Sequence, residues 1–116
     1  MRIGVPKEIK NLEYRVGLTP SSVRELIDHG HEVLVQKNAA VEIGFDDEFY
    51  LEAGARIVET AQDVFAEAEM IVKVKEPQPQ ECAMLREGQI LFTYLHLAPD
   101  TVQTQGLIAS GCTAVA

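Results

Sequence analysis

The chain of 116 residues lacks the features of several common protein classes. Its two cysteines, Cys82 and Cys112, form no C-x-x-C pair and no Cys/His cluster with the spacing of a zinc site. The hydrophobic runs are far shorter than the roughly 20 residues of a membrane span, and residues 1–8 contain no signal-peptide core. We therefore expect free, buried thiols, no metal site, no membrane contact and a reducing, cytoplasmic location.

Clusters of positive charge and phosphate-binding glycine motifs are also missing. The formal net charge is −8, with no run of like charges, which excludes the basic patch that nucleic-acid binding needs. Neither G-x-G-x-x-G nor the P-loop motif occurs. Any loop that holds the phosphates of a nucleotide cofactor is therefore expected outside these residues.

What the chain does contain is a regular alternation of short apolar runs with amphipathic segments. Helix caps at Thr19 and Thr60 and a helix stop at Gly30 support this assignment. The expected strands are residues 2–5, 31–36, 56–58, 70–75, 89–95 and 112–116, of which 56–58 has the weakest signal. The expected helices are residues 19–29, 46–53, 60–68, 79–86 and 99–110. This order predicts an α/β fold with a mostly parallel, doubly wound (Rossmann- or flavodoxin-like) sheet and helices on both faces.

The last residue, Ala116, falls within the final apolar run. We expect residues 1–116 to be the front part of a longer protein, an amino-terminal domain whose last elements are missing.

Two of the predicted strands end in groups that bind or react with ligands. The run that begins at Met70 ends with Lys75, and the run that begins at Ile90 ends with His96. In an open parallel sheet, ligands bind beyond the carboxyl ends of the strands. Lys75 is preferred to Lys73 because it lies nearer the strand end. His96 would titrate near neutral pH beside a fixed positive charge, although a structural histidine or a solvated lysine remains the alternative at each position.

The long polar connection at residues 7–18 offers further candidates. Arg15 has the planar fork that suits a carboxylate, and Glu8 could hold Arg15 or Lys75 in place; both could equally be solvated surface residues. His29 and His31 flank the glycine after the first helix and are interpreted as helix-terminus residues, not as metal ligands.

Four blocks of sequence resemble a known family. Residues 1–8 (MRIGVPKE) and 13–20 (EYRVGLTP) resemble the amino-terminal signature of the alanine dehydrogenase and nicotinamide nucleotide transhydrogenase family. Residues 70–77 (MIVKVKEP) and 91–98 (LFTYLHLA) resemble its alanine dehydrogenase branch more closely.

The resemblance implies reversible, NAD-dependent oxidative deamination of L-alanine to pyruvate and ammonia. It implies that Arg15 and Lys75 bind the substrate carboxylate and carbonyl region and that His96 is the general acid/base. From their places in the sequence, we expect Glu8 and Tyr94 to support these residues. The resemblance also implies that a second domain binds NAD and supplies a catalytic Asp, and that the full protein is a homohexamer. We therefore expect residues 1–116 alone to be inactive.

Three other functions remain open on the sequence. The transhydrogenase nucleotide subunit shares the signature of residues 1–20 but lacks a histidine at the position of His96. Saccharopine dehydrogenase uses a lysine and a histidine in a similar site, with a weaker amino-terminal match. A non-catalytic, doubly wound binding module is the alternative of another class.

Overall fold

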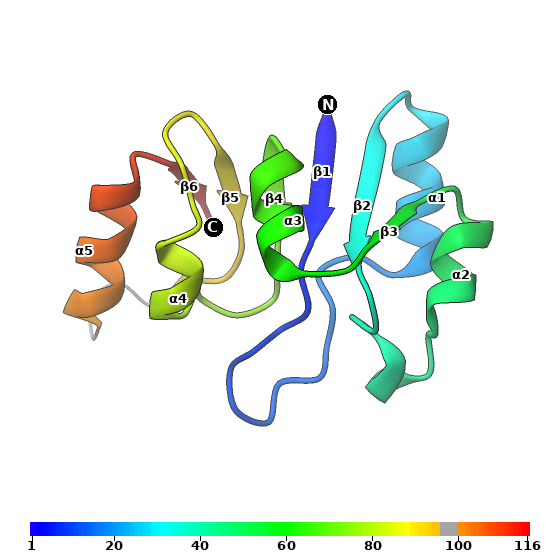
Figure 1. Ribbon diagram of the computed structural model, residues 1–116, viewed down its shortest axis with the longest axis horizontal. Helices are drawn as coiled ribbons and strands as arrows, with labels where there is room; N and C mark the ends of the chain where they lie inside the picture. Colours follow the sequence, from blue (N-terminus) through cyan, green and yellow to red (C-terminus); the bar gives the residue numbers. More distant parts are fainter. Residues whose placement is uncertain (96–99) are drawn as a thin grey trace.

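The computed structural model of the protein describes residues 1–95 and 100–116 (Figure 1). Its elements are β1 (Arg2–Val5), α1 (Pro20–Asp28), β2 (Glu32–Gln36), the 3-10 helix η1 (Val41–Ile43), α2 (Asp47–Glu52), β3 (Arg56–Val58), α3 (Ala61–Glu67), β4 (Met70–Val72), α4 (Pro79–Cys82), β5 (Ile90–Phe92), α5 (Thr101–Ser110) and β6 (Thr113–Val115). The predicted alternation is confirmed, including the weakly signalled strand at 56–58, which pairs with β2.

All six strands form one parallel sheet in the order β3-β2-β1-β4-β5-β6. The chain builds outward from β1 to β3, then crosses back and adds β4 on the other side of β1. The strand order therefore reverses between β1 and β4, and this switch point is where an open α/β sheet binds its ligand. The predicted fold class is confirmed.

Side-chain caps explain where the helices begin. The Thr19 hydroxyl accepts a hydrogen bond from the Ser22 amide (3.4 Å) at the start of α1, and the Thr60 hydroxyl accepts one from the Asp63 amide (3.1 Å) at the start of α3. Each cap satisfies an amide that has no partner within the helix, as the sequence predicted.

Three elements are shorter than predicted by at least three residues. β4 ends at Val72, not at residue 75. The Lys73 amide still donates to the Phe92 carbonyl oxygen of β5 (3.0 Å), but the Val74 and Lys75 amides donate to the Glu8 carboxylate and not to a neighbouring strand. β5 likewise covers only residues 90–92 of the predicted 89–95. α4 ends at Cys82, and the following turn brings the Arg86 guanidinium onto carbonyl oxygens at the end of α3.

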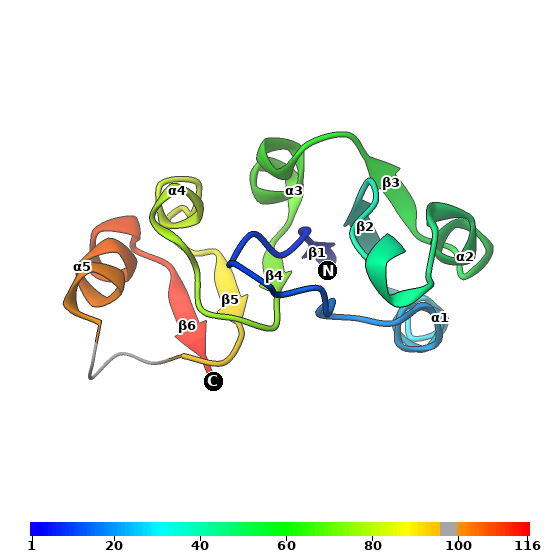
Figure 2. The ribbon, with the colours of Figure 1, turned by 90° about the horizontal axis from the view of Figure 1, so that it is seen from below.

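Helices lie on both faces of the sheet (Figure 2), and the helices of each face cover a separate apolar core. α1 and α2 contribute the fully buried Val23 and Tyr50 to the core that includes Val35 of β2. α3 and α5 contribute Phe65 and Leu107 to the core on the other face. Both cysteines are free thiols, as predicted; Cys82 is buried, but Cys112 is only partly buried, so the prediction of two buried thiols is wrong for Cys112.

Part of one sheet face is bare. On the α1 side of β5 and β6, no helix of the described residues lies over the strands (Figure 2). Phe92 and Val115 are consequently 48% and 41% exposed. None of the helices in residues 1–95 and 100–116 has the length and apolar character needed to cross a bilayer.

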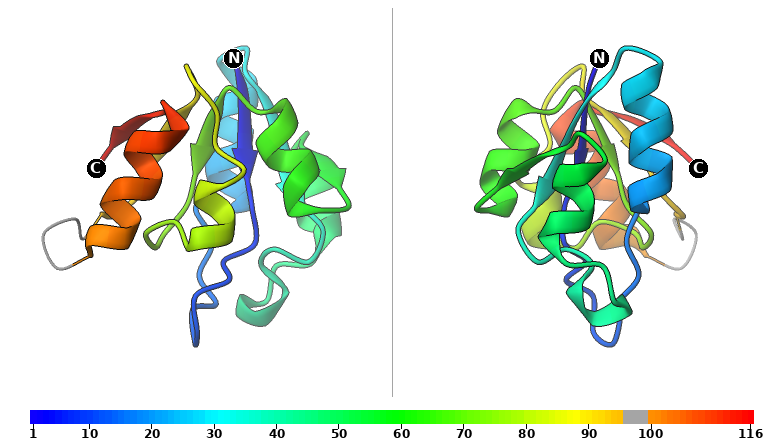
Figure 3. Two further views of the ribbon diagram at one scale, coloured as in Figure 1. Left: turned by 60° about the vertical axis from the view of Figure 1, so that its left-hand side comes forward. Right: turned by 90° about the vertical axis from the view of Figure 1, so that its right-hand side faces the viewer.

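The connection from β1 to α1 projects beyond the carboxyl ends of the strands (Figure 3). It returns to the sheet at Gly17, which lies directly against β4. A Cβ atom built on Gly17 would lie 2.4 Å from the Val72 carbonyl oxygen and 2.8 Å from its carbon. Only glycine fits here, so this contact fixes the connection that carries Arg15 over the end of β4.

We predict that Gly17→Ala lowers the free energy of unfolding by about 1–3 kcal/mol, because the added methyl group must push backbone away from backbone. Urea unfolding measures the change. As a control, exposed Gln105→Ala in α5 should change stability by less than about 0.5 kcal/mol. Equal stabilities of the two variants would mean that the close approach at Gly17 does not constrain the connection.

Candidate functional site

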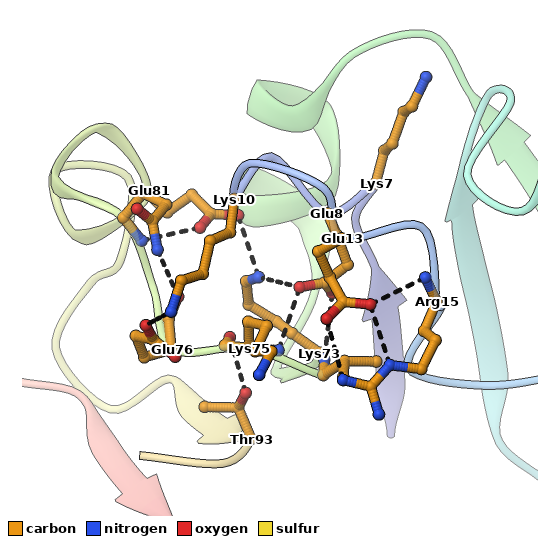
Figure 4. Close-up of polar contacts among 12 residues, drawn as sticks. Lys7, Glu8, Lys10, Glu13, Arg15, Lys73, Lys75, Glu76, Glu81 and Thr93 are labelled. Atoms are coloured by element: carbon orange, nitrogen blue, oxygen red, sulfur yellow. Dashed lines mark hydrogen bonds and ion pairs between the residues drawn. The ribbon is translucent and has the colours of Figure 1, made fainter. Parts of the chain in front are cut away.

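Charged side chains from distant parts of the chain meet at the switch point between β1 and β4 (Figure 4). Glu8 follows β1, and Lys73 and Lys75 follow β4, 65 residues or more further along the chain. The connection to α1 adds Glu13 and Arg15, while Lys7 points away from the group (Figure 4). The site is therefore built from the carboxyl ends of the two central strands.

Glu8 is the centre of this group. Its Oε1 accepts hydrogen bonds from the Lys73 ammonium (2.8 Å) and the Lys75 amide (3.1 Å), and its Oε2 accepts one from the Val74 amide (3.1 Å). The side chains of Glu8 and Lys73 are each 1% exposed. The sequence left open whether Glu8 holds Arg15, holds Lys75 or is solvated. In the structure Glu8 is bonded to the Lys75 backbone, and its ion-pair partner is Lys73.

Lys73 has a second buried partner. Its ammonium lies 3.4 Å from Oε2 of Glu81, whose side chain is 2% exposed and whose Oε1 accepts a bond from the Gln78 amide (2.9 Å). Burial raises the pKa of Glu81, and the positive charge of Lys73 opposes that shift. Lys73 is thus part of an internal group of three charged side chains, and its ammonium is not open to solvent.

Lys75 is held by its backbone and leaves its ammonium available. Its amide donates to Glu8 and its carbonyl oxygen accepts a bond from the Thr93 hydroxyl (2.8 Å). Within residues 1–95 and 100–116, its Nζ makes no hydrogen bond or ion pair. It lies near enough to Glu13 to help lower the pKa of that carboxyl group.

Arg15 forms a two-pronged ion pair with Glu13. Its Nε donates to Oε2 (3.0 Å) and its Nη2 to Oε1 (2.9 Å), and the Arg15 amide also donates to Oε2 (3.0 Å). These bonds lower the pKa of Glu13 to about 2 and raise the pKa of Arg15. The Arg15 side chain remains 62% exposed, so its guanidinium can still meet a ligand.

A cavity of about 420 Å³ adjoins this group of charged residues, although neither Arg15 nor Lys75 is among the described residues that line it. Tyr94 is at its edge, 71% exposed, with its amide bonded to the Val74 carbonyl oxygen (3.3 Å). Tyr94 is also close enough to Arg15 to contribute to the raised pKa of the guanidinium. The cavity is lined by residues from the connection and from the segments after β4, β5 and β6: Gly17, Val72, Lys73, Val74, Phe92, Thr93, Tyr94 and Ala116.

The candidate His96 lies outside the described residues, so its position relative to Lys75 stays a prediction. His29 is at the end of α1, where its Nδ1 lies 2.8 Å from the Glu25 carbonyl oxygen, in agreement with the helix-terminus interpretation. Within the described part of the chain, no three His, Cys, Asp or Glu side chains are grouped so that they could hold a metal ion.

Sequence reasoning missed Glu13 and Glu81. Each had a local signal: Glu13 stands two residues before Arg15, and Glu81 stands three residues after the residue that caps α4. The first spacing is common in loops, and the second is explained by helix capping alone. Neither signal indicates which side chain comes to share the switch point.

An open, doubly wound parallel sheet with charged side chains at its switch point defines a class of α/β domain that binds small ligands beyond its strand ends. Comparison with known proteins makes the assignment specific. The family described as "Alanine dehydrogenase/PNT, N-terminal domain" matches residues 4–116, and the chain belongs to this family.

Individual relatives agree with this assignment. The alanine dehydrogenase of Halomonas elongata is 53% identical over 116 residues, which are 100% of this chain and 31% of that protein. The solved structure of an L-alanine dehydrogenase has a TM-score of 0.96 at 52% identity and covers 100% of this chain and 32% of its own. The crystal structure of a transhydrogenase from Sinorhizobium meliloti has a TM-score of 0.92 at 28% identity, with shares of 100% and 34%. The chain thus spans about a third of the length of these relatives.

We predict that Glu8→Gln destabilises the protein by about 3–5 kcal/mol, because it leaves the buried Lys73 charge without its main partner. Adding Lys73→Met should recover part of this loss, since it removes the ammonium, and burial raises the pKa of Glu81, which favours the uncharged form of that carboxyl group once Lys73 is gone. The free energies of unfolding of the single and the double variant are measured by denaturant unfolding.

The matched control for the buried pair is Glu59→Gln, which removes an exposed carboxylate 3.8 Å from Lys37 and should cost less than about 1 kcal/mol. A double variant less stable than Glu8→Gln alone would contradict the interpretation of the Glu8–Lys73 pair.

A separate prediction concerns acid stability. The pKa of Glu13 is lower in the folded protein (about 2) than its ordinary value of 4.5, so the ionised form favours folding. This contribution is complete above pH 4.5 and is lost as the pH falls toward 2. Wild type should therefore lose its stability advantage over Glu13→Gln across this range, measured by unfolding at stepped pH; a constant difference would refute the assignment.

Proposed function

We propose that this chain is the substrate-binding part of an NAD-dependent alanine dehydrogenase, which interconverts L-alanine with pyruvate and ammonia. The observation that carries the proposal is the convergence of Arg15 and Lys75 at the switch point, two cations suited to an α-keto or α-amino carboxylate. Identity of 53% to an alanine dehydrogenase, against 28% to a transhydrogenase structure, favours this branch of the family.

Each proposed substrate contact follows from side-chain chemistry. The guanidinium of Arg15 offers paired N–H donors that match a carboxylate in a planar, two-pronged contact. The Lys75 ammonium stabilises negative charge that develops on the carbonyl oxygen, and its fixed backbone means that little reorganisation is needed.

His96 is proposed as the general acid/base. A neutral imidazole accepts a proton from the attacking water or amine and returns it in the reverse reaction. This role rests on the family resemblance of residues 91–98.

The described residues do not fit a dinucleotide. In a dinucleotide-binding sheet the turn after the first strand is short and glycine-rich, so that its amides approach the pyrophosphate. Here that connection is long, and the Val74 and Lys75 amides at the neighbouring strand end are already bonded to the Glu8 carboxylate, so they are not free to approach a pyrophosphate. We therefore propose that NAD is bound by a second domain outside residues 1–116, and that this chain acts on the substrate.

The remaining proposals concern the whole protein. The chain is taken as the incomplete amino-terminal substrate domain of a longer, cytoplasmic protein that forms a homo-oligomer, a hexamer by family resemblance. The match covers about 31% of the length of an alanine dehydrogenase, which supports the proposal that this domain belongs to a longer protein.

A chimaera tests the function directly. This chain replaces the matching 31% of the Halomonas elongata enzyme, and the NADH-dependent reductive amination of pyruvate is measured. We expect turnover by the chimaera and none by residues 1–116 alone.

In this chimaera, Lys75→Ala and Arg15→Ala should each lower kcat/KM by at least about 30-fold, the loss expected when a charged partner is removed from a binding site. His96→Ala should lower kcat by about 100-fold or more.

The matched controls are Lys7→Ala and Arg24→Ala, which remove exposed cations away from the cluster and should leave kcat/KM unchanged. An inactive chimaera, or equal losses in the Lys75 and Lys7 variants, would contradict the proposed function. Unchanged turnover in His96→Ala would leave that histidine without a catalytic role.

A further inference from the structure

The guanidinium of Arg15 has two edges that can receive a carboxylate, and one is already filled. Glu13 occupies the edge formed by Nε and Nη2, with donor–acceptor distances of 3.0 and 2.9 Å. The outer edge, formed by Nη1 and the second N–H of Nη2, makes no hydrogen bond to any described residue. Arg15 therefore has one edge held by the protein and one edge open to a ligand.

The side chains of Glu13 and Arg15 differ strongly in their exposure to solvent. The Glu13 side chain is 8% exposed and the Arg15 side chain is 62% exposed. Glu13 also accepts the Arg15 amide through Oε2, so the same carboxylate holds the backbone and the side chain of Arg15. The nearly covered Glu13 thus holds the solvent-exposed Arg15 in place.

Glu13 also lies close to the second cation of the site. The hydrogen bonds from Arg15, with a smaller contribution from the charge of Lys75, lower the pKa of Glu13 to about 2, so it is a carboxylate at neutral pH. A negative charge near both cations limits their mutual repulsion.

We propose that Glu13 is a positioning residue: it holds the Nε and Nη2 edge of Arg15 so that the outer edge receives the substrate carboxylate beside Lys75. The proposal rests on the proposed function, because it assigns the carboxylate of that substrate to Arg15. Glu13 acts through Arg15 and does not touch the substrate.

The test is Glu13→Gln in the chimaera, since glutamine keeps the size of the side chain but can accept from only one of the two guanidinium nitrogens. We expect the KM for pyruvate and the calorimetric Kd for pyruvate to rise by about 10- to 100-fold, the loss expected for charge-assisted hydrogen bonds. We expect kcat and the KM for NADH to change little. Glu13→Asp, which restores the charge, should recover part of the affinity, and Glu42→Gln, an exposed carboxylate in η1, should change nothing.

A double variant separates positioning from a structural role. With Arg15→Ala in place, Glu13→Gln should not raise the KM or the Kd for pyruvate any further, because the residue through which Glu13 acts is gone. The proposal is overturned if Glu13→Gln leaves the Kd for pyruvate unchanged, if it lowers kcat alone, or if its effect persists at full size without Arg15. A chimaera that binds pyruvate without turnover contradicts the proposed function instead, and the Kd series still decides the role of Glu13.

Discussion

The contact between the Glu8 carboxylate and the Lys73 ammonium joins the two central strands at the point where the sheet reverses its order. Burying two charges is costly unless their remaining hydrogen-bonding capacity is used. Here the carboxylate also accepts the amides of Val74 and Lys75, and the ammonium also meets Glu81. The same bonds end β4 and set the path of the segment that follows, so the local backbone and the charge pair depend on each other.

Around this pair, charged residues that stand two positions apart in the sequence differ in how far their side chains are covered. Lys73 and Lys75 stand two positions apart, yet one side chain is 1% exposed with two carboxylates and the other has an available ammonium. Glu13 and Arg15 repeat the arrangement, with the carboxylate covered and the guanidinium open. In both cases the covered charge is held in an ion pair with another described residue.

The sequence was sufficient for the order of the elements, because caps and apolar periodicity are local signals. The rule that ligands bind at strand ends also directed attention to Lys75, and the polar connection directed it to Arg15. The partners of these residues were not predictable: Glu8 could be assigned several roles, and Glu13 was overlooked, because side-chain pairing depends on packing that no local pattern encodes. The role proposed for His96 rests on its place at the end of a predicted strand and on the family resemblance.

The placement of the site at the switch point has a consequence for how the protein folds. The bonds from Glu8 to Lys73 and to the amides of residues 74 and 75 close chain segments of 65 to 67 residues, whereas the Glu13–Arg15 pair closes a segment of two. Long closures are entropically unfavourable until the intervening strands are paired, and contacts of this kind slow folding. The arginine side of the site can thus assemble locally, while the lysine side forms only when β4 docks against β1.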